Sequence, residues 1–159
     1  MLIVLRGNSG SGKSTIATYL QEELPRPTAI LSQDYFHRVI YDEREQANLA
    51  HADLIEAAAL HCLALGQHVI LEGIFNSDRY SPMLARVGAQ ADDARFYAFD
   101  LSFEETVHRH QDRSKAVDFT AADMAAWYHG WQPLSFVPER RIGPSETARD
   151  IVSRVLENR

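Results

Sequence analysis

The feature that most constrains this chain is a glycine-rich segment placed between an apolar run and a helical pattern. Residues 7–14 read GNSGSGKS and match G-x-x-x-x-G-K-[ST] at every fixed position. Glycines at these positions let successive backbone N–H groups turn inward toward phosphate oxygens, where side chains would obstruct the approach. The segment follows a predicted strand at Leu2–Leu5 and opens a predicted helix at Ser14–Leu24, as the motif requires. The sequence therefore predicts a strand, a phosphate-binding loop and a helix in direct succession.

The residues of this loop have distinct expected roles toward a bound nucleotide. Lys13 is one of only two lysines in the chain, and its compact ammonium group is suited to reach the β- and γ-phosphates. The hydroxyl of Ser14 is expected to ligate Mg²⁺, and Thr15 to lie near the α-phosphate. The predicted nucleotide-binding residues all belong to the loop and the first helical turn: Gly7, Asn8, Ser9, Gly10, Ser11, Gly12, Lys13, Ser14 and Thr15. A chance match arises in roughly one random chain of this length in two hundred, and the strand–loop–helix context lowers that further.

Length and composition fit a single globular domain over residues 1–159. The chain has 159 residues, of which 45% are apolar and 24% charged, enough to bury a sizeable core. Because a predicted strand begins at Leu2 and no apolar run approaches the roughly 18 residues of a membrane helix, we expect a cytoplasmic protein without a membrane partner. Cys62 is the only cysteine, which excludes an intramolecular disulfide. The net charge of −6 argues against broad electrostatic capture of nucleic acid.

Apolar runs that alternate with helical patterns predict an α/β fold. The predicted strands are Leu2–Leu5, Thr28–Leu31, His68–Leu71, Phe96–Leu101 and, with a weaker pattern, Phe136–Ile142. The predicted helices are Ser14–Leu24, Ala47–Leu65, a helix capped by Ser102 and one from about Ser145 toward Glu157. Strands joined by helical crossovers form parallel sheets covered on both faces, so we expect a three-layer sandwich with a five-stranded parallel sheet. The irregular segment 112–120 belongs to a predicted lid at residues 112–131.

The phosphate-binding loop does not by itself select a reaction, because ATPases, GTPases and kinases share it. Guanine specificity is associated with an Asn-Lys-x-Asp motif, and the only other lysine, Lys115, lies in Ser-Lys-Ala instead. A regulatory GTPase is therefore disfavoured, and the rest of the chain must indicate the reaction.

Beyond the loop, three further motifs carry a resemblance to a known superfamily. They are LSQDYFHR at 31–38, HVILEGIFNSDR at 68–79 and FDLSFEETVHRHQDR at 99–113. In these motifs, and in element order over nearly its whole length, the chain resembles the small P-loop kinases. That superfamily includes adenylate kinase, gluconate kinase, chloramphenicol phosphotransferase and the kinase domains of polynucleotide kinases. The resemblance implies a P-loop NTPase fold with a short helical lid, and ATP and Mg²⁺ as cofactors.

The resemblance also implies roles for residues outside the loop. Asp34 accepts the proton of the attacking hydroxyl, and Arg38 and Arg79 bind the acceptor. Glu72 takes the place of a metal-binding acid at the end of a strand, although adenylate kinase has Asp-Gly-Phe-Pro-Arg there and this chain has glutamate and no proline. Arginines before the lid contact the transferred phosphate. The implied catalytic residues are Lys13, Asp34, Arg109 and Arg113, the metal ligands are Ser14 and Glu72, and the substrate-binding residues are Asp34, Arg38 and Arg79.

General chemistry supports these roles but leaves alternatives open. A carboxylate within hydrogen-bond reach orients an attacking hydroxyl and takes its proton, whereas Asp34 can instead cap a helix and pair with Arg38 on the surface. Glu72 can be a buried structural acid, and arginines on helices are often solvated or paired. The aromatic cluster WYHGW at 127–131 either walls an acceptor pocket or packs in the core. The turn Ile142–Pro144 matches the place of the adenine loop in related kinases.

The leading hypothesis is an ATP- and Mg²⁺-dependent kinase that moves the γ-phosphoryl group to a hydroxyl of a small-molecule acceptor, such as a metabolite, nucleoside or antibiotic. One alternative is a 5′-hydroxyl polynucleotide kinase, which the Asp34 and Arg38 pair favours and the acidic net charge disfavours. Another is a nucleotide-binding, ATP-hydrolysing regulatory protein without an acceptor. No motif in the sequence is dedicated to one acceptor.

Overall fold

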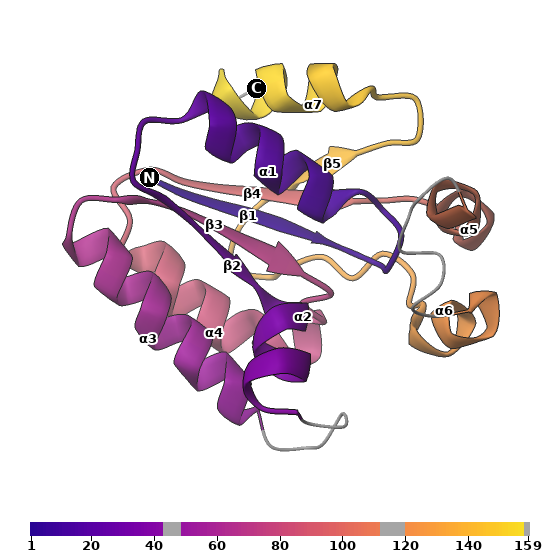
Figure 1. Ribbon diagram of the computed structural model, residues 1–159, viewed down its shortest axis with the longest axis horizontal. Coiled ribbons are helices and arrows are strands. Elements are labelled where there is room, and N and C mark those ends of the chain that lie inside the picture. Colours follow the sequence, from indigo (N-terminus) through magenta and orange to yellow (C-terminus); the bar gives the residue numbers. More distant parts are fainter. Residues whose placement is uncertain (43–48, 112–119, 158–159) are drawn as a thin grey trace.

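The computed structural model describes residues 1–42, 49–111 and 120–157, and Figure 1 shows how their helices and strands are arranged. The strands are β1 (Leu2–Gly7), β2 (Thr28–Ser32), β3 (His68–Gly73), β4 (Ala94–Phe99) and β5 (Arg140–Ile142). The helices are α1 (Lys13–Glu23), α2 (Gln33–Tyr35), the π-helical η1 (Phe36–Ile40), α3 (Ala50–Ala64), α4 (Ser77–Ala89), α5 (Phe103–Gln111), α6 (Ala121–Trp127) and α7 (Ala148–Leu156).

The strands form one parallel sheet in the order β2-β3-β1-β4-β5. Strand β1 is central, because Leu2 pairs with Val69 of β3 on one side and with Ala94 of β4 on the other. All five strands end at the same edge of the sheet, so the segments that follow β1, β2, β3 and β4 meet there. The predicted five-stranded parallel sheet is confirmed.

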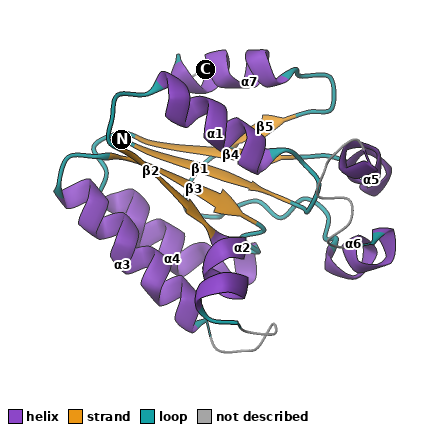
Figure 2. Ribbon diagram, viewed as in Figure 1, coloured by secondary structure: helices purple, strands orange, loops and turns teal. Residues whose placement is uncertain are grey.

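Helices cover both faces of the sheet, which gives the three layers visible in Figure 2. Alternate residues of β1 enter different clusters: Ile3 and Leu5 pack with α1 and α7, whereas Leu2 and Val4 pack with α3 and α4. All four side chains are fully buried, as a central strand between two helical layers requires. Helices α5 and α6 lie beyond the carboxyl ends of the strands (Figure 1). Among the described helices, none combines the length and apolar character needed to cross a membrane.

The structure differs from the predicted boundaries toward the C-terminus. Strand β5 begins at Arg140 rather than at Phe136, because Pro138 lacks a ladder donor and the Glu139 side chain turns inward to bind Arg6. The final helix begins at Ala148 rather than near Ser145, since its capping box is formed by Thr147 and Asp150.

Two further differences from the sequence predictions concern α4 and the predicted lid. No predicted range corresponds to α4, because Pro82 and Gly88 interrupt its apolar pattern. Of the lid predicted at 112–131, residues 112–119 lie outside the described residues. Residues 120–131 form α6, its N-cap and the start of a segment without regular secondary structure.

Candidate active site

The glycine-rich loop joins the end of β1 to the start of α1. Gly10 and Gly12 have φ angles of 77° and 107°, which lie in the left-handed region that glycine adopts without strain. Gly12 is the N-cap of α1, and among the described residues no side chain caps this helix. Its first turn, Lys13–Thr15, is also free of acidic residues. The uncapped N-terminus of α1, with the positive end of the helix dipole, therefore suits an anion such as a phosphate group.

Lys13 folds back over the loop that precedes it. Its Nζ donates hydrogen bonds to the carbonyl oxygen of Asn8 at 2.8 Å and to Ser11 Oγ at 3.2 Å, and the side chain is buried. The next two residues, Ser14 and Thr15, have exposed side chains on the first turn of α1. The loop thus presents one held ammonium group and two accessible hydroxyls at the same helix end.

Helices α5 and α6 pack against the outer side of the loop. A Cβ atom added to Gly10 would lie 2.5 Å from the carbonyl oxygen of Thr106 in α5 and 2.8 Å from Met124 Cε in α6. The Thr106 carbonyl belongs to the main chain of a buried helical residue, so it cannot move away at low cost. The close approach explains why this position of the loop needs glycine, in addition to its positive φ.

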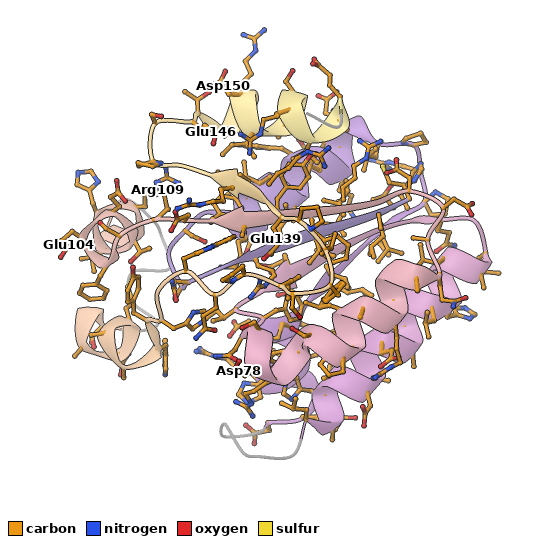
Figure 3. All side chains as sticks on the ribbon, turned by 180° about the vertical axis from the view of Figure 1, so that it is seen from behind. Asp78, Glu104, Arg109, Glu139, Glu146 and Asp150 are labelled. Carbon is orange, nitrogen blue, oxygen red and sulfur yellow. The ribbon has the colours of Figure 1, made fainter. Side chains whose placement is uncertain are left out.

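Arg109 connects the loop to the turn after β5. Its Nη1 donates to the carbonyl oxygen of Ser11 and its Nη2 to that of Pro144, both at 3.0 Å. The turn is itself held, because the Glu146 carboxylate accepts a hydrogen bond from the Gly143 N–H at 2.8 Å. Figure 3 shows Arg109 reaching from α5 toward this part of the chain. Arg109 therefore lies beside the predicted nucleotide site.

Arg113, which is predicted to contact the transferred phosphate, lies outside the described residues, so its role stays a prediction.

On the opposite side of the site, Asp34 and Arg38 form an ion pair. Asp34 lies in α2 directly after β2, and Arg38 Nε is 2.8 Å from Asp34 Oδ1 one helical turn later. The Asp34 side chain is 67% exposed, so a ligand can reach its carboxylate. The predicted shared face is present, and so is the pairing that the alternative, structural role of Asp34 predicts. The role of Asp34 as a base stays a prediction.

Arg38 also contacts α6. Its Cζ lies 5.3 Å from the centroid of the Trp127 ring, within the range of a cation–π interaction. Hydrogen bonds from the Thr120 N–H and hydroxyl lower the pKa of the Asp123 carboxyl, and the charge of Arg38 lowers it further. Because Met124 of the same helix touches the glycine-rich loop, α6 contacts both the loop and the segment that holds Arg38.

The aromatic residues of the segment 127–131 make contacts with different parts of the protein. Trp127 stacks with Arg38, whereas the Tyr128 hydroxyl donates to the carbonyl oxygen of Leu101 and its ring packs edge-on against Phe103. The centroid of the Trp131 ring lies 5.1 Å from Arg141 Cζ.

Glu72 lies between the two sides, at the end of β3. It pairs in register with Leu5 of β1 and with Ser32 of β2, two residues before Asp34. Ile70, which shares its face by the two-residue strand period, packs in the cluster beneath α1. The carboxylate is therefore placed on the α1 face of the sheet, and it is 5% exposed. Arg79, a predicted substrate-binding residue, lies in the first turn of α4 and is half-buried.

A polar network that sequence reasoning missed fixes α2 to the end of β3. The Gln33 carboxamide accepts from the Ile74 N–H at 3.2 Å and donates to the Tyr80 hydroxyl at 3.1 Å. That hydroxyl lies 2.8 Å from Nε2 of the buried His51. A Cβ on Gly73 would approach Gln33 Cβ to 2.5 Å, so the absence of a side chain there admits the carboxamide. The sequence signal available for this network was its position: Gln33 directly precedes the candidate residue Asp34, and Gly73 directly follows the candidate residue Glu72.

With this geometry established, comparison with known proteins places the chain in a family. A family model described as an AAA domain matches residues 2–132. The chain belongs to this AAA domain family. No curated protein sequence matches it.

Solved structures share the fold of this AAA domain over almost the whole chain. A proposed kinase from Chloroflexus aurantiacus superposes with a TM-score of 0.74 at 21% identity, covering 99% of this chain and 94% of that one. The APS kinase of Mycobacterium tuberculosis, solved with AMPPNP and APS, gives 0.70 at 17% identity, covering 98% and 95%. A gluconokinase from Sinorhizobium meliloti gives 0.63 at 17% identity, covering 98% and 93%. The P-loop NTPase fold predicted from the sequence is confirmed.

Proposed function

We propose that this AAA domain protein is an ATP- and Mg²⁺-dependent kinase that transfers the γ-phosphoryl group of ATP to a hydroxyl of a small-molecule acceptor. One observation carries the proposal: a glycine-rich loop that holds Lys13 follows β1, and an accessible carboxylate, Asp34, follows β2 at the same edge of the sheet. The kinases that share the fold support a phosphotransferase, since one of them was solved with an ATP analogue and its acceptor.

On the donor side, the loop amides and Lys13 bind the phosphates of ATP. Ser14 and Glu72 would hold Mg²⁺, because a hydroxyl and a carboxylate are the oxygen donors that this hard cation prefers. Bound there, Mg²⁺ would supply positive charge against the negative charge that develops on the phosphoryl oxygens during transfer. The burial of Glu72 at the strand end keeps its carboxylate directed to one position rather than free in solvent.

On the acceptor side, Asp34 orients the attacking hydroxyl and takes its proton. The acceptor oxygen forms a bond to the γ-phosphorus, the bond from that phosphorus to the β–γ bridging oxygen breaks, and ADP leaves. Arg38 and Arg79 bind the acceptor. Arg109 and Arg113 supply positive charge at the transferred group, where cations stabilise the phosphoryl oxygens.

The proposed activity is tested by incubating the protein with ATP labelled at the γ-phosphate and a panel of acceptors. The panel contains sugars, nucleosides, a chloramphenicol-type antibiotic and a 5′-hydroxyl oligonucleotide. We expect the label on a small hydroxyl compound, with an acceptor KM that changes little with salt if that compound is neutral. Label on the oligonucleotide, with affinity that falls steeply as salt rises, would instead identify a polynucleotide kinase. Label released only as free phosphate would contradict the kinase assignment.

The replacement Asp34→Asn is expected to lower kcat about a hundredfold, because the amide keeps the size of the side chain but accepts no proton from the hydroxyl. ATP affinity is expected to stay unchanged, because α6 lies between the two groups. One part of α6 contacts the phosphate-binding loop, and another contacts Arg38, the partner of Asp34. Labelled transfer and an ATP titration measure the two effects separately. The matched control is Asp92→Asn, an exposed aspartate before β4 at the opposite edge of the sheet. Undiminished transfer by Asp34→Asn would remove the base assignment.

A further inference from the structure

The segment between α6 and β5 crosses the end of β1. This segment, residues 129–139, is called the strap, and Figure 2 shows it as the coil that returns from α6 to β5. Its first four residues line a small cavity together with the ends of β1 and β4. Hydrogen bonds tie the strap to two residues of the β1–loop unit, Arg6 and Asn8.

The Asn8 side chain holds the beginning of the strap. Its Nδ2 donates to the carbonyl oxygen of His129 at 2.6 Å, and its Oδ1 accepts from the His129 N–H at 3.0 Å. The carboxamide thus pairs with one residue through both of its polar atoms, as a neighbouring strand would. Asn8 is buried, so water does not compete effectively for these bonds.

The Asn8 main chain holds the catalytic lysine. The carbonyl oxygen of Asn8 accepts the 2.8 Å hydrogen bond from Lys13 Nζ and also the 3.3 Å bond from the Ser11 N–H. One residue therefore binds the strap with its side chain and the interior of the phosphate-binding loop with its carbonyl group. A shift of Asn8 moves the acceptor that places the Lys13 ammonium.

The far end of the strap is anchored independently. Arg6 donates through Nη2 to the carbonyl oxygen of Gln132 at 3.0 Å and through Nη1 to both carboxylate oxygens of Glu139 at 2.7 Å. The ion pair is buried, with the two side chains 5% and 1% exposed. Because this anchor does not involve Asn8, the strap is a fixed support against which the Asn8 carboxamide can hold the loop.

We propose that Asn8 is a positioning residue for nucleotide binding: by pairing with the main chain of His129, it fixes the phosphate-binding loop on the strap in the conformation that places Lys13. This inference rests on the ATP binding assumed in the proposed function. It assigns the strap, which supplies no predicted phosphate contact, a part in ATP affinity.

The first test compares Asn8→Ala with Asn76→Ala. Both variants lose an asparagine carboxamide, but Asn76 caps α4 by accepting from the Asp78 N–H at 2.9 Å, away from the loop. We expect Asn8→Ala to raise the Kd for ATP about tenfold, the effect of losing two partly buried hydrogen bonds that hold the binding conformation. Asn76→Ala is expected to lower the melting temperature and leave the Kd unchanged. Isothermal titration and thermal unfolding give the two quantities.

The second test changes the strap and leaves every loop atom in place. His129→Pro removes the N–H that donates to Asn8, and Tyr128 before it already has an extended ψ of 128°, which a following proline requires. We expect the ATP Kd to rise in this variant as well. An unchanged Kd in His129→Pro, or a lower melting temperature with an unchanged Kd in Asn8→Ala, would overturn the inference. If the wild-type protein binds no ATP, the proposed function itself fails.

Discussion

Replacing Lys13 by alanine is expected to lower kcat for phosphoryl transfer about a thousandfold or more while the protein stays folded. The ammonium group sits within the loop, where two neutral oxygens hold it, and a bound triphosphate would provide the negative charge that it faces. Preorganised positive charge at the reacting phosphate is among the largest contributions to such reactions. Its hydrogen bonds to Asn8 and Ser11 lie within the loop, so the packing of the core does not depend on them.

The second variant at this position, Lys13→Arg, is expected to be inactive as well. The site is narrow, since the lysine side chain is 7% exposed, and a planar guanidinium is bulkier than an ammonium group. Labelled transfer measures activity, and thermal unfolding verifies the fold of each variant. An alanine variant that retains activity would contradict the assignment of the loop as the ATP site.

Predictions that depend on local sequence were the most successful. The loop at 7–14 and its flanking strand and helix follow from a motif and from apolar periodicity, both of which span only a few residues. The pairing of Asp34 with Arg38 follows from helical spacing, which brings residues four apart onto one face. In each case the interacting residues are neighbours along the chain, so the pattern contains the geometry.

Contacts between distant segments were not predictable from the pattern. Asn8 and His129 are 121 residues apart, and Arg6 and Glu139 are 133 apart. An arginine inside an apolar strand reads as an interruption until its partner is known. The error at β5 has the same origin, because Glu139 leaves the strand in order to reach Arg6.

The contacts of Arg109 were not predictable for a different reason. Its partners are the carbonyl oxygens of Ser11 and Pro144, and every residue carries a carbonyl group. A side chain that binds main-chain atoms leaves no complementary residue type in the sequence. The observed contacts place Arg109 at the end of the sheet where the predicted contact with the transferred phosphate would also place it.

Replacing Glu139 by alanine is expected to reduce the free energy of unfolding by about 3–5 kcal/mol, because it leaves the buried guanidinium of Arg6 without its counter-charge. Arg6 would keep its bonds to the carbonyl oxygens of Phe75 and Gln132, which are neutral and do not compensate a full charge. Leu134 would also lose an acceptor, since its N–H donates to Glu139 Oε2 at 2.8 Å. Urea unfolding followed by circular dichroism measures the loss.

Two comparisons separate the effect of burial from the effect of losing any ion pair. Glu56→Ala breaks the pair with Arg86, whose side chain is 57% exposed, and is expected to cost about 1 kcal/mol or less. The double replacement Arg6→Met with Glu139→Leu removes both charges and is expected to recover part of the stability. The recovery is incomplete, since the Leu134 N–H and the carbonyl oxygens of Phe75 and Gln132 lose their hydrogen bonds to this pair. If Glu139→Ala lowers the free energy of unfolding no more than Glu56→Ala does, the pair of Arg6 and Glu139 does not anchor the strap. The rigid support that the Asn8 carboxamide needs would then be absent.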